Sequence, residues 1–268
     1  MPSTIGEMPS STSLSASRKP RPSYELLCEL VFRPLAQLVV RMLLPLGVSP
    51  PAVVLAATAT GLAAAGELWH GDLIGAAILL QLKTVLDNAD GQLARASGRV
   101  SVLGRYLDSE SDLLINTALF AALAHVTGRP VLAGVSFVVL TLVLGIDFNL
   151  ERLYRRENGE SPEARPAASG LAGVLARIYD VVYGPQDRLV EWFVEMRLRR
   201  LRATPAARRV YHDRATLQIV VNFGLSTQLA ALGACLALGQ PGTYLWIALG
   251  CGAALLPLEI RRELRART

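Results

Sequence analysis

The chain has 268 residues, of which 51% are hydrophobic and only 18% are charged. Because soluble domains carry about 25% charged residues, this composition argues against an ordinary soluble protein, and its apolar content excludes disorder over most of the chain. The net charge of +5 predicts an anionic partner such as nucleic acid, anionic lipid or a phosphorylated substrate, and three scattered cysteines exclude a disulfide framework and a cysteine-ligated zinc site.

The N-terminal region divides into two parts. Residues 1–23 are rich in Ser and Pro and carry basic residues near their end, which is typical of a disordered basic tail rather than of a signal peptide. In residues 24–46, apolar side chains recur every three or four positions, with charged side chains between them. Because charges this frequent disfavour a spanning helix, we expect an amphipathic helix in the membrane interface.

Six longer apolar runs follow, each close to the roughly 20 residues that a helix needs to span a bilayer. The runs are 51–69, 72–92, 107–126, 130–151, 215–238 and 242–260. A soluble helical bundle is less favoured, because its helices would show polar stripes that these runs mostly lack. The expected fold class is an all-α integral membrane protein, with six transmembrane helices preceded by an interfacial amphipathic helix.

The basic residues predict the orientation of these helices. With the N-terminal tail in the cytoplasm, three inner segments hold most of the Arg residues: 93–105, 152–214 and 261–268. The short outer loops then hold a single basic residue, Arg129. Since basic residues favour the inner side of a membrane, we expect an integral protein of a bacterial-type cell membrane with its inner segments in the cytoplasm.

The segment 152–214 is expected to form a cytoplasmic helical insertion in a membrane domain of residues 24–260, which a basic C-terminal tail, 261–268, follows. Its apolar positions predict two amphipathic helices that Gly184-Pro185 separates. The second helix ends in an Arg-rich run, which favours a hairpin resting on anionic headgroups. The alternative is that the insertion also covers a substrate pocket.

Carboxylates gather at one membrane face. Asp87 and Asp90 share a face near the end of the second run, and Asp108 and Asp112 share a face at the start of the third. Such carboxylates are unfavourable near lipid and therefore indicate function. No His or Cys lies nearby in the sequence, so oxygen ligands would select Mg²⁺ or Mn²⁺ over zinc. Lys83, one turn before Asp87, is expected to pair with it.

Residues suited to phosphate lie between these carboxylates. Gly91 follows Asp90 directly and lets a ligand approach the backbone, while Arg95 can hold a phosphate with two hydrogen bonds. Gly104 provides close approach one turn before Asp108. Metal-binding carboxylates beside a phosphate-binding Arg at a membrane indicate chemistry on a lipid-linked diphosphate.

The spacing of these residues resembles the signature of the CDP-alcohol phosphatidyltransferases, with every gap kept: Asp87-x2-Asp90-Gly91-x2-Ala94-Arg95-x8-Gly104-x3-Asp108-x3-Asp112. The resemblance covers residues 24–260 apart from the inner segment 152–214, since the family is similar in having a short interfacial helix and six spanning helices. It implies transfer of a phosphatidyl group from a CDP-linked lipid such as CDP-diacylglycerol to an alcohol, with release of CMP, in phospholipid synthesis. It also implies a homodimer.

The same resemblance implies a role for each motif residue. The four aspartates, Asp87, Asp90, Asp108 and Asp112, resemble the ligands of two Mg²⁺ or Mn²⁺ ions, and Asp112 looks like the general base for the acceptor hydroxyl. Gly91, Arg95 and Ser101 resemble contacts to the CDP-lipid. One departure is the entry to the first run, where Pro51 and Val54 replace the Asn and Thr that are common in the family. Side-chain contacts from that entry to the nucleotide are therefore not expected.

The acceptor alcohol is left open by the motif. The Arg surplus favours a phosphorylated polyol, such as glycerol 3-phosphate or inositol 1-phosphate, over a neutral or zwitterionic alcohol. Its phosphate would bind arginines at the inner ends of the fourth and fifth runs: Arg152, Arg155, Arg156, Arg208, Arg209 and Arg214. A transporter with a carboxylate cation path is disfavoured, because the carboxylates lie at one face only. Anionic membrane lipids are expected partners, and nucleic acid is not.

Overall fold

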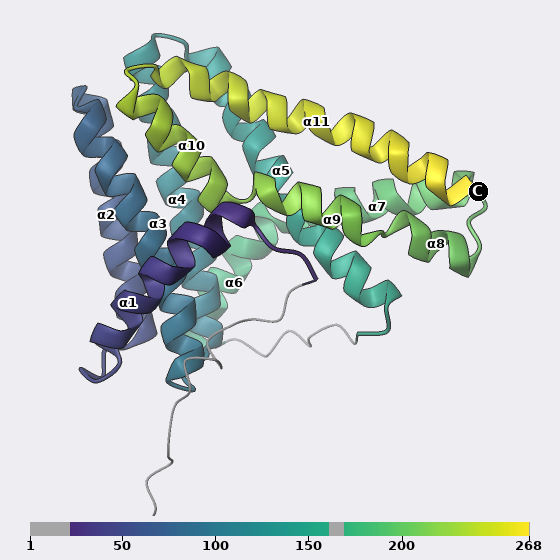
Figure 1. Cartoon of the computed structure of the whole chain (residues 1–268), viewed down its shortest axis with the longest axis horizontal. Helices are drawn as coiled ribbons and strands as arrows, with labels where there is room; N and C mark the ends of the chain where they lie inside the picture. The colour runs from purple at the N-terminus through teal and green to yellow at the C-terminus, as the bar shows by residue number, and fades with distance from the viewer. Residues whose placement is uncertain (1–21, 161–168, 268) are drawn as a thin grey trace, which may run out of the picture.

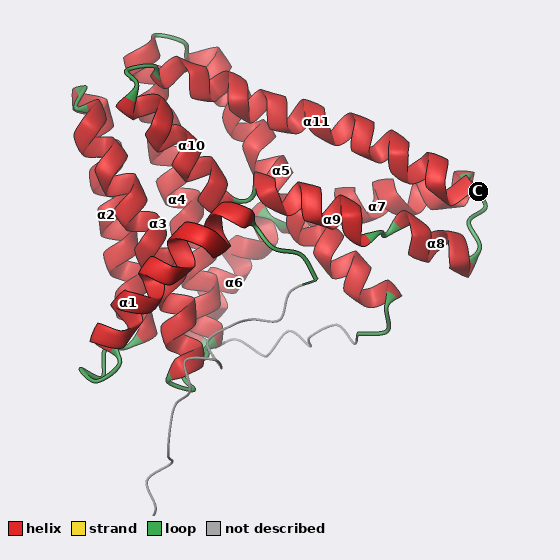
Figure 2. Cartoon of the chain, in the orientation of Figure 1, coloured by secondary structure: helices red, strands yellow, loops and turns green. Residues whose placement is uncertain are grey.

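The computed structural model describes residues 22–160 and 169–267, and the regular elements in these ranges are all helical (Figure 2). The expected all-α class is therefore confirmed. Nearly all of the predicted N-terminal tail, residues 1–21, lies outside the described ranges.

The first described helix has two contrasting faces. A π-helical turn, η2 (Cys28–Phe32), leads into α1 (Arg33–Leu43), which lies obliquely across α3 (Leu73–Ala96) in Figure 1. On the inner face, Ala36 and Val40 join residues of α3 in one buried cluster. The outer face leaves large apolar side chains exposed: Leu30, Leu35, Leu38 and Met42.

Five helices form the bundle that holds the site: α2 (Pro50–His70), α3, α4 (Val102–Thr127), α5 (Pro130–Glu157) and α10 (Leu225–Ala237). Prolines in the first turns of α2 and α5 preset the helical φ, and Gly71 and Gly128 end α2 and α4, respectively, at positive φ. The bundle closes around buried leucines and alanines of all five helices.

Small residues allow these helices to approach closely. Gly61 of α2 faces Ile115 of α4, where an added Cβ would lie only 2.8 Å from the Ile115 Cδ1 atom. A side chain at position 61 would therefore push the two helices apart, which explains why glycine occupies a position inside a helix, where it is intrinsically unfavourable.

The remaining helices form a second layer. α6 (Gly170–Val182) packs against α4, and α7 (Gly184–Arg200) and α8 (Pro205–Tyr211) lie between the second half of α5 and α11 (Pro241–Arg267), as Figure 1 shows. Leu153, Val194, Leu198 and Tyr211 form the buried cluster of this part. As the sequence predicted, α6 ends just before Gly184-Pro185.

Two helices continue past the apolar runs that predicted them. α5 continues to Glu157, inside the predicted insertion, and α11 continues to Arg267 through most of the predicted C-terminal tail. The polar ends of both helices find partners that stabilise them: Arg197 of α7, for example, pairs with Glu263 of α11 at 2.8 Å. Both helices therefore continue beyond their apolar runs, because side chains from α7 and α8 pack against the added turns.

The predicted fifth run is broken in the structure. Residues 215–238 divide into α9 (Arg214–Val220), a 3₁₀ turn η3 (Val221–Phe223) and α10, with Gly224 extended at ψ 167°. Glu25 caps α10 across the break, since its Oε1 accepts hydrogen bonds from the backbone N and the hydroxyl of Thr227 at 2.6 and 2.7 Å. This long-range cap gives a backbone N–H in the first turn of α10 a hydrogen-bond acceptor, and so it stabilises a new helix start after the break.

Within residues 22–160 and 169–267, four helical stretches are long and apolar enough to cross a membrane: α2, α5, residues 205–237 and α11. α3 and α4, which the sequence also predicted to span, match them in length but carry the charged residues of the motif.

Candidate functional site

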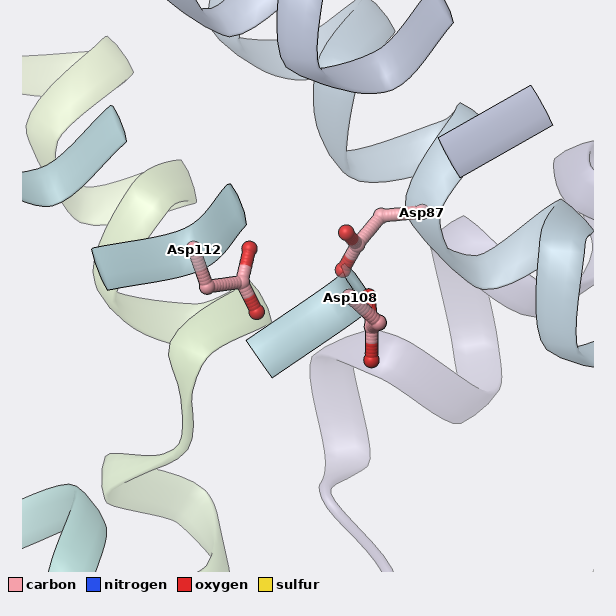
Figure 3. Close-up of side chains that lie close together, drawn as sticks. All are labelled: Asp87, Asp108 and Asp112. Carbon is pink, nitrogen blue, oxygen red and sulfur yellow. The ribbon is translucent and has the colours of Figure 1, made fainter. Parts of the chain in front are cut away.

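Three of the four predicted carboxylates converge between α3 and α4. Asp87 comes from α3, and Asp108 and Asp112 lie one turn apart on α4 (Figure 3). One oxygen of each lies within 4.8 Å of the others, and all three side chains are half-buried. Carboxylates this close repel one another, so the arrangement favours a bound cation with oxygen ligands.

Lys83 ties this group together from inside the bundle. Its ammonium donates hydrogen bonds to Asp87 Oδ1 at 2.8 Å and to Asp112 Oδ1 at 2.5 Å, and its side chain is only 1% exposed. The predicted pair with Asp87 is confirmed, whereas the second bond, to Asp112 across the helices, was not predicted. One positive charge thus faces three carboxylates, and the site remains suited to a divalent cation.

Asp90 lies one helical turn beyond Asp87 and is buried. It is not among the residues whose carboxylate oxygens meet within 4.8 Å, so the structure brings three of the four predicted ligands together and keeps the fourth beside them. Gly91 follows, and an added Cβ there would lie 3.3 Å from Arg95 Nη1. Glycine at position 91 therefore makes room for the Arg95 guanidinium along the helix.

Ser101 lies at the start of α4 and caps it. Its hydroxyl accepts a hydrogen bond from the backbone N of Gly104 at 3.0 Å, and an added Cβ at Gly104 would lie 3.1 Å from that hydroxyl. The two motif positions therefore start the helix that presents Asp108 and Asp112.

Two tyrosines at the end of α6 pack against the first half of α4. Tyr179 contacts Tyr106 of α4 edge-on, with the ring centres 5.7 Å apart, and also contacts Tyr183. The Tyr183 hydroxyl donates to the Ser109 carbonyl at 3.4 Å. Burial raises the pKa of the Tyr183 phenol, and the nearby Asp112 carboxylate raises it further. These tyrosines were not predicted, because the contact joins positions 74 residues apart in the sequence.

Most of the arginines predicted to bind an acceptor are engaged elsewhere. Four of the six form ion pairs with glutamates: Arg152, Arg155, Arg156 and Arg208. Arg214 Nε donates to the carbonyl of Pro22 at 2.7 Å. In none of these contacts does an arginine reach the three carboxylates.

Arg156 and Arg209 also line a cavity of about 380 Å³ near the end of α5, together with Glu157 and Pro205. The six predicted arginines are therefore spread over the end of α5, over α8 and over the start of α9, and they do not gather in one place. Arg152, on the side of α5 that faces α7, donates to Glu191 Oε1 at 2.8 Å.

Comparisons with known proteins agree with the motif. A sequence model described as CDP-alcohol phosphatidyltransferase matches residues 44–196, more than half of the chain. Similar proteins include the Bifunctional IPC transferase and DIPP synthase of Thermococcus kodakarensis, 38% identical over 37% of this chain, and the Archaetidylinositol phosphate synthase of Pyrococcus horikoshii, 34% identical over 31% of it. The matched regions cover only 23% and 45% of those two proteins.

Proposed function

Because this chain belongs to the CDP-alcohol phosphatidyltransferase family, we propose that it transfers the substituted phosphate group of a CDP-linked lipid, such as CDP-diacylglycerol, to an alcohol and releases CMP. The observation that carries the proposal is the group of three carboxylates that α3 and α4 bring together around Lys83. The motif that contains them lies entirely within the matched residues 44–196.

The ligand set fits two Mg²⁺ or Mn²⁺ ions. Asp87, Asp108 and Asp112 offer oxygen atoms only, and among the residues that the structure describes no His or Cys joins the group. Asp90, one turn from Asp87, completes the set. Bound to these aspartates, the ions would neutralise the diphosphate and stabilise the charge on the departing CMP.

The residues of the chain supply proton transfer and positioning. The acceptor oxygen forms its bond to the lipid-bearing phosphorus while Asp112 takes the hydroxyl proton, and the bond from that phosphorus to CMP breaks. The Lys83 ammonium donates a hydrogen bond to Asp112 Oδ1 at 2.5 Å, so the other carboxylate oxygen of Asp112 can accept the proton. Gly91, Arg95 and Ser101 would contact the CDP-lipid.

A phosphorylated polyol is the acceptor that we propose. The name of the Pyrococcus relative denotes synthesis of a lipid with an inositol phosphate headgroup, which supports inositol 1-phosphate over glycerol 3-phosphate. The basic residues on α5, α8 and α9 supply cations that could hold its phosphate: Arg152, Arg155, Arg156, Arg208, Arg209 and Arg214.

For the membrane arrangement we propose six spans, with α3 and α4 added to the four apolar stretches. The exposed apolar face of α1 supports a helix lying in the interface. The distribution of Arg residues supports an active site facing the cytoplasm of a bacterial-type cell, with basic segments on anionic lipids. A homodimer completes the proposal, as the family resemblance implies.

The test supplies purified protein with CDP-diacylglycerol, Mg²⁺ or Mn²⁺, and one acceptor at a time: inositol 1-phosphate, glycerol 3-phosphate or serine. CMP release and the product lipid are measured together. We expect wild-type protein to form both, and Asp108→Asn to lose most turnover. Asp72→Asn is the matched control, because Asn can still cap α3 at its far end. CMP release with none of the acceptors would contradict a transferase and favour a transporter or a scaffold.

A further inference from the structure

A polar cluster lies between the first turn of α7 and the facing side of α5. Asn149 of α5 is fully buried and donates from Nδ2 to Asp187 Oδ1 at 2.8 Å. Arg152, one turn further along α5, donates to Asn149 Oδ1 at 2.7 Å and to Glu191 at 2.8 Å. None of these residues belongs to the motif, and of them only Arg152 belongs to the predicted acceptor set.

Three polar atoms of this cluster lack hydrogen-bond partners among the described residues. They are Gln186 Oε1, Asp187 Oδ2 and Arg152 Nε, and each is buried from solvent. Asp187 as a whole is only 7% exposed. Native proteins leave few buried polar atoms unpaired, so two acceptors and one donor together indicate a ligand that supplies the missing partners.

The cluster lies about as far along α5 from the α4–α5 turn as Asp112 lies along α4. α4 and α5 leave the tight turn at Gly128-Arg129 and run antiparallel in contact with each other. Asp112 lies 16 residues before Gly128, and Gly145 lies 16 residues after Arg129, so both are about 24 Å from the turn. An added Cβ at Gly145 would lie 3.0 Å from Gln186 Oε1. Gln186 therefore meets α5 at a point about as far from the turn as Asp112 is on α4.

Tyr183 docks this turn of α7 against α4. It precedes α7, its hydroxyl donates to Ser109 of α4, and its carbonyl accepts from the backbone N of Asp187 at 2.9 Å. Asp187 thus lies one turn from a residue that touches the helix of Asp112. Gln186 is half-buried and packs against a glycine, so its side chain can move to admit a ligand.

We infer that Gln186 and Asp187 of α7, with Arg152 of α5, form the subsite that holds the acceptor next to Asp112. This inference rests on the proposed function and names the acceptor chemistry. Gln186 Oε1 and Asp187 Oδ2 accept hydrogen bonds from hydroxyl groups of a polyol, and Arg152 Nε donates to its phosphate. Inositol 1-phosphate keeps several hydroxyls besides the reacting one, whereas glycerol 3-phosphate keeps a single one. The subsite therefore favours the former.

The test measures kcat and KM for inositol 1-phosphate and glycerol 3-phosphate, and KM for CDP-diacylglycerol. In Asp187→Asn the Nδ2 group replaces the oxygen that faces the hydroxyls, and in Gln186→Leu the acceptor atom is lost. We expect each variant to raise the KM for inositol 1-phosphate about 10-fold, with the KM of the CDP-lipid unchanged. The preference for inositol 1-phosphate over glycerol 3-phosphate should fall accordingly. Asp180→Asn, on the exposed side of α6, is the matched control and should match wild type.

Two results would count against the subsite. One is an unchanged acceptor preference in both variants, whether or not their thermal stability falls. The other is an equal rise in KM for donor and acceptor, which a general disturbance of the fold would cause. Failure of the proposed function can be told apart from failure of the subsite, because wild-type protein would then release no CMP with either acceptor. Gln186→Leu changes an atom without a protein partner, so it keeps the test valid if Asp187→Asn does not fold.

Discussion

Replacing Lys83 with methionine tests whether one buried ammonium joins α3 to α4 through the carboxylates. Its Nζ bonds to Asp87 Oδ1 and Asp112 Oδ1 at 2.8 and 2.5 Å from a side chain that is 1% exposed. Methionine fills similar space without charge, so both carboxylates lose their cation. Breaking a buried ion pair costs about 3–5 kcal/mol, and the 21% exposure of each carboxylate places the expected loss near the lower end, about 3 kcal/mol.

The assay is denaturant unfolding of the protein in detergent, once with EDTA and once with excess Mg²⁺. We expect Lys83→Met to lower the free energy of unfolding by the whole of this amount in EDTA and by less in Mg²⁺. An ion that binds only the folded protein stabilises it and also neutralises the carboxylates. Arg199→Met is the matched control, since Arg199 is 78% exposed and pairs with Glu195 at 3.3 Å. Exposed pairs contribute about 0–1 kcal/mol. If Lys83→Met loses no more stability than Arg199→Met in EDTA, the reasoning is refuted.

Three further predictions follow from the site and the bundle. Asp112→Asn should lower kcat by about 10²–10⁴-fold and change the KM of the CDP-lipid little, because it removes the proton acceptor; steady-state kinetics would contradict this if kcat stayed within a few-fold. Activity should disappear in excess EDTA and return with Mg²⁺ or Mn²⁺, and full activity in EDTA would exclude the metal site. Gly61→Ala should destabilise the bundle by about 1–3 kcal/mol, since its Cβ would lie 2.8 Å from Ile115, whereas Gly66→Ala, with open space around it, should stabilise α2 slightly in the same unfolding assay.

The sequence predicted those features that depend on local spacing. Apolar runs placed the ends of α2, α3, α4 and α5 to within six residues, because each helix buries a face or contacts lipid along its own length. The i, i+4 spacing of Asp108 and Asp112 put both on one face of α4, and the short connection from α3 brings Asp87 opposite them. The side chains of one helical hairpin therefore form the centre of the site.

Features that depend on distant parts of the chain could not be predicted. The break before α10 depends on Glu25, which is 202 residues away from Thr227 in the sequence, and the contact of Tyr183 with Ser109 depends on how α6 docks. The arginines look alike in the sequence, but glutamates of the same or facing helices take up four of the six. Only the packing of α7 against α5 shows which polar atoms remain without partners.

The central claim is that the carboxylates of α3 and α4 carry out phosphatidyl transfer. The most direct measurement follows purified protein with CDP-diacylglycerol, inositol 1-phosphate and Mn²⁺, and counts CMP and product lipid over time. We expect CMP and product lipid to appear in equal amounts, both to require the acceptor, and Asp112→Asn to suppress both. Equal rates of CMP release with and without acceptor, or undiminished release by Asp112→Asn, would contradict the claim.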